Sequence, residues 1–225
     1  MDIKLNFVQA GEGFPLVLLH GNGEDYTYFK HQIEPFSQHY RVIIVETRGH
    51  GQSPRGNAPF TLAQFAEDLK NFLDEQGIEK CHLLGFSDGG NIALEFVLRW
   101  PEYVEKLVLN GANLFPEGLV GWLQEDNARR MAELTSRGLE HEEILREYEM
   151  VDLMASQPQI HPDQLSGLTM PTLVVAGEDD VICEDQTRLI AASIPGSRLE
   201  ILPSDHFVAK HNWRVFNPVI LDFLA

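Results

Sequence analysis

Near the middle of the chain, a short apolar run passes into an amphipathic stretch through a serine that has a glycine two positions away on each side. The apolar run covers residues 82–84, and Ser87 lies at the centre of a G-x-S-x-G pattern over residues 85–89. The apolar positions that follow recur at helical spacing: Ile92, Ala93, Phe96 and Val97. Because glycine lacks a β-carbon, the chain can turn sharply beside the serine without a collision. The pattern predicts a buried strand, a tight turn and a helix, with Ser87 at the turn.

Similar short apolar runs recur along the chain between longer amphipathic stretches. We interpret them as buried parallel strands, at residues 15–19, 42–45, 82–84, 107–109, 172–176 and 199–202. Ile3, Leu5 and Phe7 alternate with polar residues, which predicts a half-exposed edge strand that pairs with the run at 15–19 as a hairpin. The alternation of strands and helices predicts one α/β domain over residues 1–225, with a mostly parallel sheet of about seven strands flanked by helices.

Residues 114–168 interrupt this alternation. They contain no strand signal, and their apolar residues recur near helical spacing, at Val120, Leu123, Met131, Leu134, Ile144, Tyr148 and Val151. The segment holds 11 acidic residues and 4 arginines, which predicts an acidic, solvated outer surface. We expect a helical insertion within the single domain.

Composition and charge argue against several classes of protein. A formal net charge of −17 repels phosphate backbones and disfavours nucleic-acid binding. No stretch approaches the roughly 18 apolar residues needed to span a bilayer, and residues 1–6 lack the layout of a secretory signal. Cys81 and Cys183 stand outside any metal-ligand spacing, and we find no cofactor or nucleotide motif. We expect a cytoplasmic protein that acts on a small molecule, without a metal or cofactor and without a nucleic-acid or membrane partner.

A serine hydroxyl is a weak nucleophile until a base removes its proton, so a histidine should lie nearby in the fold. His206 follows the last predicted strand, 199–202, after a short turn and precedes the final helix. Ligands of parallel α/β sheets bind at the carboxyl ends of the strands, which is where this position places the imidazole. The other histidines fall on predicted surface helices, turns or strand interiors. We therefore expect His206 to be the general base.

The base needs a carboxylate to hold its tautomer and to stabilise the imidazolium. Asp180 comes shortly after the strand at 172–176 and so should reach the same edge of the sheet as Ser87 and His206. Asp179 and Asp205 remain alternatives. The order serine, aspartate, histidine along the chain is the one expected of this kind of hydrolase.

A glycine-rich turn, His20-Gly21-Asn22-Gly23, directly follows the strand at 15–19. Such a turn lets backbone N–H groups approach a substrate oxygen, and we assign the N–H of Asn22 and that of Asp88 as oxyanion donors. The helix after Ser87 would add its positive dipole end at the same place. His20 more readily makes a structural hydrogen bond than a catalytic one.

Taken together, these motifs resemble the α/β-hydrolase superfamily over essentially the whole chain. The segment 48–53 also looks like the family's R-G-x-G-x-S loop, with Glu46 in place of the usual preceding aspartate. The stretches 85–90 and 110–113 are similar to the biphenyl-hydrolase-like subgroup, whose members include hydrolases of amino-acid esters. The resemblance implies that residues 114–168 form a short cap over an active site.

The expected activity is hydrolysis of a small carboxylic ester, or of a thioester or α-amino ester, through an acyl-enzyme on Ser87. Carbon–carbon bond hydrolysis or elimination by the same three residues is an alternative, and a slow-turnover ligand receptor is another. The side chain of Asp88 either caps the helix that follows the serine or binds a substrate ammonium. Three cap residues are candidates for the substrate pocket: Phe115, Leu119 and Trp122.

Overall fold

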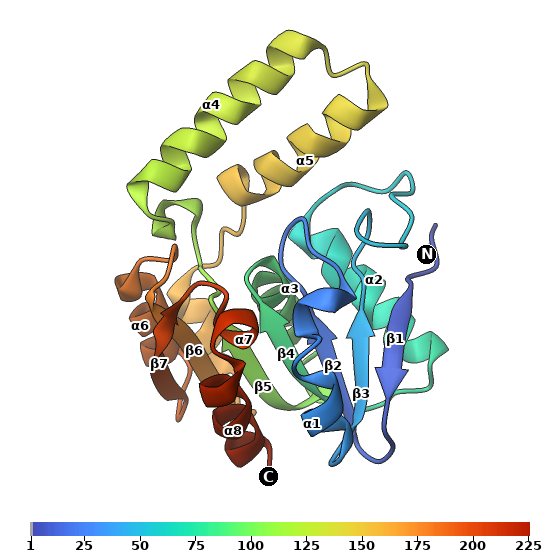
Figure 1. Cartoon of the computed structure of the whole chain (residues 1–225), viewed down its shortest axis with the longest axis vertical. Coiled ribbons are helices and arrows are strands. Elements are labelled where there is room, and N and C mark those ends of the chain that lie inside the picture. The colour runs from blue at the N-terminus through green and yellow to red at the C-terminus, as the bar shows by residue number, and fades with distance from the viewer. Residues whose placement is uncertain (1) are drawn as a thin grey trace.

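A computed structural model describes residues 2–225 and contains one seven-stranded sheet (Figure 1). The strands lie in the order β1-β3-β2-β4-β5-β6-β7, and every neighbouring pair is parallel except β1 with β3. Their bounds are β1 Phe7–Ala10, β2 Pro15–Leu19, β3 Arg41–Val45, β4 Cys81–Phe86, β5 Val104–Asn110, β6 Thr172–Asp179 and β7 Arg198–Asp205. The predicted α/β class, with a mostly parallel sheet of seven strands, is confirmed.

The prediction for the first strand was wrong in its bounds and in its partner. β1 begins only at Phe7 and pairs antiparallel with β3, with Phe7 opposite Val45. Pairing with β2 is excluded because β2 already has parallel neighbours on both edges, β3 and β4. Leu5 is nevertheless buried, since the backbone of Asn6 is held by hydrogen bonds from Glu46 and to Ser53.

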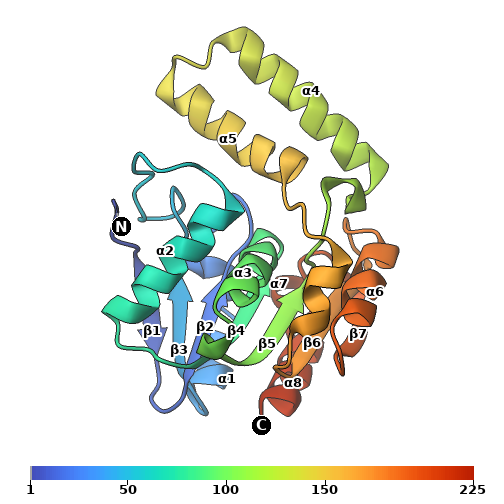
Figure 2. The same cartoon turned by 180° about the vertical axis from the view of Figure 1, so that it is seen from behind.

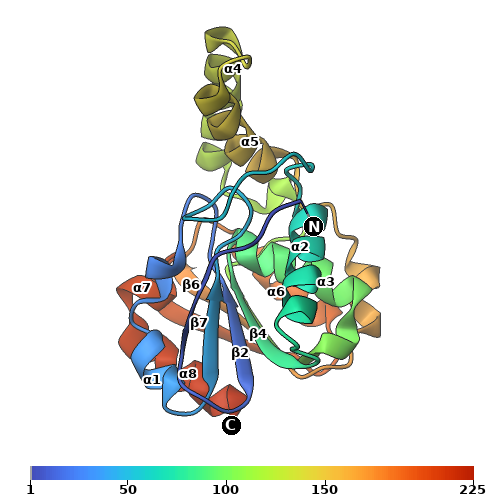
Figure 3. The same ribbon diagram turned by 90° about the vertical axis from the view of Figure 1, so that its right-hand side faces the viewer.

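Helices cover both faces of the sheet, as the two further views show (Figures 2 and 3). One face carries α2 Leu62–Glu75, α3 Asp88–Arg99 and α6 Glu184–Ser193, and the other carries α1 Ile33–Ser37, α7 Val208–His211 and α8 Trp213–Leu224. Short 3-10 turns complete the connections, at Tyr26–Phe29, Pro101–Tyr103, Pro116–Gly118 and Pro162–Gly167. No helix among residues 2–225 is both long enough and apolar enough to cross a bilayer.

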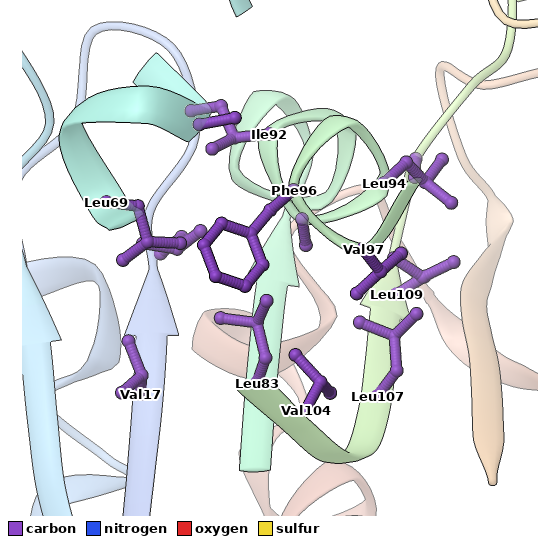
Figure 4. Close-up of a cluster of buried hydrophobic side chains, with 14 of the residues drawn as sticks. Val17, Leu69, Leu83, Ile92, Leu94, Phe96, Val97, Val104, Leu107 and Leu109 are labelled. Atoms are coloured by element: carbon purple, nitrogen blue, oxygen red, sulfur yellow. The ribbon is translucent and has the colours of Figure 1, made fainter. Parts of the chain in front are cut away.

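The larger core cluster fixes α3, the helix that follows Ser87, on the sheet. Phe96 of α3 is fully buried and lies among Leu83 of β4, Leu107 of β5 and Leu69 of α2 (Figure 4). Burying a side chain of this size contributes roughly 1.5–3 kcal/mol relative to exposing it. The packing therefore holds the start of α3, and the turn before it, in one position.

Two long helices lie between β5 and β6, within residues 114–168. They are α4 Gly121–Arg137 and α5 Glu142–Ser156, and they pack on each other through a small cluster of Leu134, Ile144 and Val151. This helical hairpin stands beyond the carboxyl ends of the strands and projects away from the sheet (Figures 1 and 3).

Candidate active site

Ser87 occupies a strained turn between β4 and α3. Its φ of 54° and ψ of −122° make it the one non-glycine residue with a positive φ in the described part of the chain. A β-carbon added at Gly85 would lie 2.2 Å from the carbonyl oxygen of Gly89, and one at Gly89 would lie 2.3 Å from that of Leu19. The glycines of the motif are therefore required by the closeness of the backbone on both sides. Strain of this kind typically costs about 1–3 kcal/mol and is found at functional sites.

The structure brings Ser87, His206 and Asp180 together at the carboxyl edge of the sheet. Nε2 of His206 lies 3.0 Å from Oγ of Ser87, and Nδ1 lies 2.6 Å from Oδ1 of Asp180. The side chains of His206 and Asp180 are 9% and 3% exposed. With the proton on Nδ1 donated to the carboxylate, Nε2 is free to accept the proton of the serine hydroxyl.

Among the three acidic candidates, only Asp180 reaches the imidazole of His206. Its carboxylate also accepts hydrogen bonds from the backbone N–H of Ile182, at 2.8 Å, and of Gly177, at 3.3 Å. Asp205 instead contacts His211, and Asp179 is exposed to solvent. Backbone donors and the histidine therefore fix the Asp180 carboxylate in one orientation.

The turn after β2 lies against the serine. A β-carbon at Gly21 would come within 2.9 Å of the Phe86 ring and 3.1 Å of Cβ of Ser87, so glycine is needed for this approach. The two residues whose backbone N–H groups are the predicted oxyanion donors are Asn22, on this turn, and Asp88, the first residue of α3. Their role as oxyanion donors stays a prediction.

The side chain of Asn22 connects three segments. Its Nδ2 donates to Oδ2 of Asp88 at 2.9 Å and to the carbonyl oxygen of Met150, in α5, at 2.9 Å. A second link, 2.7 Å long, runs from Nε of Arg55 to Glu149 of the same helix. The hairpin is thus tied to the turn after β2 and to the loop after β3.

The carboxylate of Asp88 does not cap α3, contrary to one of the two predicted roles. It accepts hydrogen bonds from the side-chain amides of Asn22 and Asn91, at 2.9 and 3.3 Å. Burial raises the pKa of Asp88, and the two amides oppose that shift. One donor, Asn91, lies one turn further along α3 and the other, Asn22, lies on the turn after β2, so side-chain amides rather than backbone N–H groups satisfy the carboxylate.

His20 has the structural role that was expected of it. Its Nδ1 lies 2.8 Å from the carbonyl oxygen of Gly21, and its Nε2 accepts a hydrogen bond from the N–H of Thr47 at 3.1 Å. Burial lowers the pKa of His20 to about 4, so the ring is neutral near pH 7. The side chain holds the turn after β2 against the loop after β3.

A cavity of about 260 Å³ opens beside Ser87 and His206, under the base of the hairpin. Leu119 and Trp122 line it as predicted, and Trp122 is 63% exposed at its mouth. Phe115 was wrongly expected there: its ring packs against the core cluster under α3 instead. Met154, a further apolar residue of the insertion that the sequence indicated, also lines it. The lining residues that the sequence did not indicate are Phe86, Asn113, Leu123, Gln157, Val181, Ile182 and Phe207.

Sequence reasoning also missed Glu24, which lines the same cavity. Burial raises the pKa of this carboxyl to about 7, and Lys210 and His206 act in the opposite direction. The signal that could have indicated it is its place two residues after Asn22, in the turn that follows β2 at the edge of the sheet that holds the site. Within residues 2–225, no group of three or more His, Cys, Asp or Glu side chains is arranged to hold a metal ion.

Comparison with known proteins agrees with the fold. The family model for the alpha/beta hydrolase fold matches residues 15–135. A 2-hydroxy-6-oxononadienedioate/2-hydroxy-6-oxononatrienedioate hydrolase of Cupriavidus pinatubonensis is 32% identical, over 100% of this chain and 91% of that protein.

Two solved structures extend the comparison. A hydrolase from Pseudomonas aeruginosa is 28% identical with a TM-score of 0.80, covering 99% of this chain and 95% of that one. An esterase from Thermogutta terrifontis, 24% identical, shares the fold with a TM-score of 0.82 over 99% and 93% of the two chains. The chain therefore belongs to the α/β-hydrolase fold family and is a hydrolase.

Proposed function

We propose that the protein hydrolyses a small carboxylic ester, or alternatively a thioester or an α-amino ester, through an acyl-enzyme on Ser87. The observation that carries this proposal is the pair of short contacts from His206, 3.0 Å to Ser87 and 2.6 Å to Asp180, beside a largely apolar cavity. A nucleophile, an aligned base and an orienting carboxylate are the parts that acyl transfer requires.

In this mechanism His206 takes the proton of Ser87 as Oγ attacks the ester carbonyl. The N–H groups of Asn22 and Asp88 stabilise the oxyanion of the tetrahedral intermediate, and the loss of one such donor typically costs about 10²–10³ in rate. His206 then protonates the leaving alcohol and later removes a proton from the water that attacks the acyl-enzyme. Asp180 stays ionised and stabilises the imidazolium.

In the same proposal residues 1–225 form one domain, and residues 114–168 act as its cap. Leu119, Trp122 and Met154 of this segment line the cavity, and the links from Asn22 to Met150 and from Arg55 to Glu149 support a closed position over Ser87. The proposal further places the protein in the cytoplasm with a small molecule as substrate, and the net charge of −17 disfavours nucleic acid as a partner.

Carbon–carbon bond hydrolysis is a second candidate, favoured by the similarity to the 2-hydroxy-6-oxononadienedioate hydrolase of Cupriavidus pinatubonensis. The substrate of that relative is a dioate and so carries two carboxylates. The cavity of this chain holds the acidic side chains of Glu24 and Asp88, and no lysine or arginine of residues 2–225 lines it. The two carboxylates of a dioate would lose water in this cavity without gaining a lysine or arginine partner, so an ester without negative charge suits the site better.

The test is a panel of short-chain nitrophenyl esters, assayed with the wild type and Ser87→Ala in parallel. The wild type should release nitrophenol, and Ser87→Ala should lose about 10⁶ in turnover, as removal of such a nucleophile typically does. The same two proteins are given 2-hydroxy-6-oxononadienedioate, with product analysis. Cleavage of the dioate without cleavage of any ester would replace the proposal by carbon–carbon bond hydrolysis. Binding without turnover of either would favour a ligand receptor.

A further inference from the structure

A second cavity lies at the base of the helical hairpin, where α4 begins and α5 ends (Figures 1 and 2). It is a groove of about 210 Å³ that the two helices and the turn at Pro116–Gly118 enclose. Most of the residues that line this groove are apolar: Pro116, Leu119, Ala128, Met131, Met154 and Ala155. Met131 also packs against the small cluster between α4 and α5, so the groove begins where the core of the hairpin ends.

The groove adjoins the catalytic cavity. Leu119 and Met154 line both, so these two side chains form a partition between the groove and the space beside Ser87. Leu119 is held in place, because it is 7% exposed, pairs with Ile182 in a β-bridge and accepts a hydrogen bond at its carbonyl oxygen. Met154 is only half-buried, and its unbranched thioether side chain has three rotatable bonds. Met154 is therefore the part of the partition that can move aside.

The polar residues of the groove leave little for a polar ligand to bind. Gln124 donates both of its amide hydrogens, to the carbonyl oxygens of Glu117 and Leu119 at 3.2 and 2.6 Å. Asn127 is 3% exposed, so its amide presents little surface to the groove. Over residues 2–225, no lysine or arginine lines the groove, and the carboxylate of Glu117 lies on its exposed side. An apolar chain suits these walls, because it needs no hydrogen-bond partner in return for the water that it loses.

The volumes point to the same kind of ligand. Cavities that bind small molecules usually measure about 300–1,000 Å³. The catalytic cavity, at about 260 Å³, is smaller than this range, and the groove adds about 210 Å³ on the other side of the partition. A substrate that uses both places its ester group at Ser87 and the end of a narrow chain beyond Met154.

We propose that the groove binds the far end of an unbranched apolar chain of the substrate, carried by the acyl or the alcohol group of the ester. This inference rests on the proposed function and adds the length and shape of the ester to it. The side chain of Met154 moves aside as the chain passes between the two compartments. Each methylene that leaves water for the groove contributes about fourfold to kcat/KM, which corresponds to about 0.8 kcal/mol.

The experiment measures kcat/KM for two series of unbranched esters, nitrophenyl esters from acetate to octanoate and acetate esters from ethanol to octanol. In the wild type, kcat/KM should rise by about fourfold per methylene in the series whose chain enters the groove. Ala128→Trp, which places an indole at the groove, should lower the ratio of the longest to the shortest ester of that series by roughly 10- to 100-fold. Ala132→Trp makes the same change one turn further along α4, at an exposed position outside the groove, and should leave the ratio unchanged.

The partition is tested separately at Met154. Met154→Ala shortens the side chain that separates the two compartments and should raise the ratio of long to short esters. Met154→Ile introduces a β-branched side chain that is stiff at χ1 and should lower it. The same ratio in both variants as in the wild type would show that no chain passes this residue, and would overturn the proposal.

The outcomes separate the groove from the proposed function. A ratio that both tryptophan variants change equally, or a kcat/KM that falls with chain length in both series, would overturn the groove while ester hydrolysis stands. A wild type that hydrolyses no ester would remove the proposed function. Calorimetry with octan-2-one and butan-2-one then tests the groove alone: tighter binding of the longer ketone that Ala128→Trp abolishes supports it, and equal binding by the wild type and Ala128→Trp overturns it.

Discussion

Replacing Gly111 by alanine should slow catalysis by displacing the imidazole of His206, although none of the three proposed catalytic residues is replaced. Gly111 follows β5 with φ +62°, and a β-carbon there would lie 2.8 Å from Cε1 and 3.0 Å from Nδ1 of His206. Carbon atoms pack at about 3.5–4.0 Å, so the imidazole must move by about 0.7 Å or more. A misplacement of about 1 Å can cost 10²-fold in rate, and we expect kcat to fall about 10- to 100-fold.

Gly77→Ala is the matched control for the backbone. Gly77 has φ +65°, and a β-carbon there would meet nothing within 4 Å. Both variants should lose about 1–2 kcal/mol of unfolding free energy, because each places a β-carbon in the left-handed region. Urea unfolding measures that loss, and hydrolysis of a nitrophenyl ester measures kcat. A kcat for Gly111→Ala within twofold of the Gly77→Ala value would refute the claim that His206 has no room to move.

Two further predictions concern stability. Arg48 is fully buried, and its Nε and Nη2 donate to Asp68 at 2.7 and 2.8 Å. Asp68→Ala should therefore lower the free energy of unfolding in urea by about 3–5 kcal/mol. Glu105→Ala, which breaks an exposed ion pair with Lys80, should lower it by at most about 1 kcal/mol. Equal losses would contradict the role of burial. His20 has a pKa lowered from 6.5 to about 4, so the folded protein binds fewer protons there than the unfolded chain, and stability from this group is lost as pH falls from about 6.5 to 4. Unfolding of the wild type and His20→Gln at pH 7 and pH 4.5 checks this: the variant should show the smaller change between the two values.

Much of the site follows from local patterns in the sequence. Ser87, Asp180 and His206 each follow a predicted strand within a few residues, and the carboxyl ends of parallel strands meet at one edge. In the structure they directly follow β4, β6 and β7. The hydrophobic runs and the glycines around Ser87 are local properties, since they depend on residues a few positions apart. They were therefore sufficient to predict the α/β fold and the three side chains that the structure places in contact, whose catalytic roles remain proposals.

Features that depend on neighbours distant in the chain could not be predicted. β1 pairs with β3 because both edges of β2 are already occupied by β3 and β4. The choice between Asp180 and Asp205 depends on which carboxylate faces His206, and only the fold shows that it is Asp180. In the same way, Phe115 packs into the core rather than the cavity because neighbouring helices determine its direction.

The sequence by itself determined how strands and helices alternate along the chain, the turn at Ser87, and the edge of the sheet at which Ser87, Asp180 and His206 lie. These follow from backbone periodicity and from glycine, whose effects act over a few residues. Only the tertiary structure decided which side chains enter the cavity and which find hydrogen-bond partners. Glu24 and Asp88 have the same carboxylate chemistry, yet packing gives Asp88 two amide donors and leaves Oε2 of Glu24 with none among the described residues.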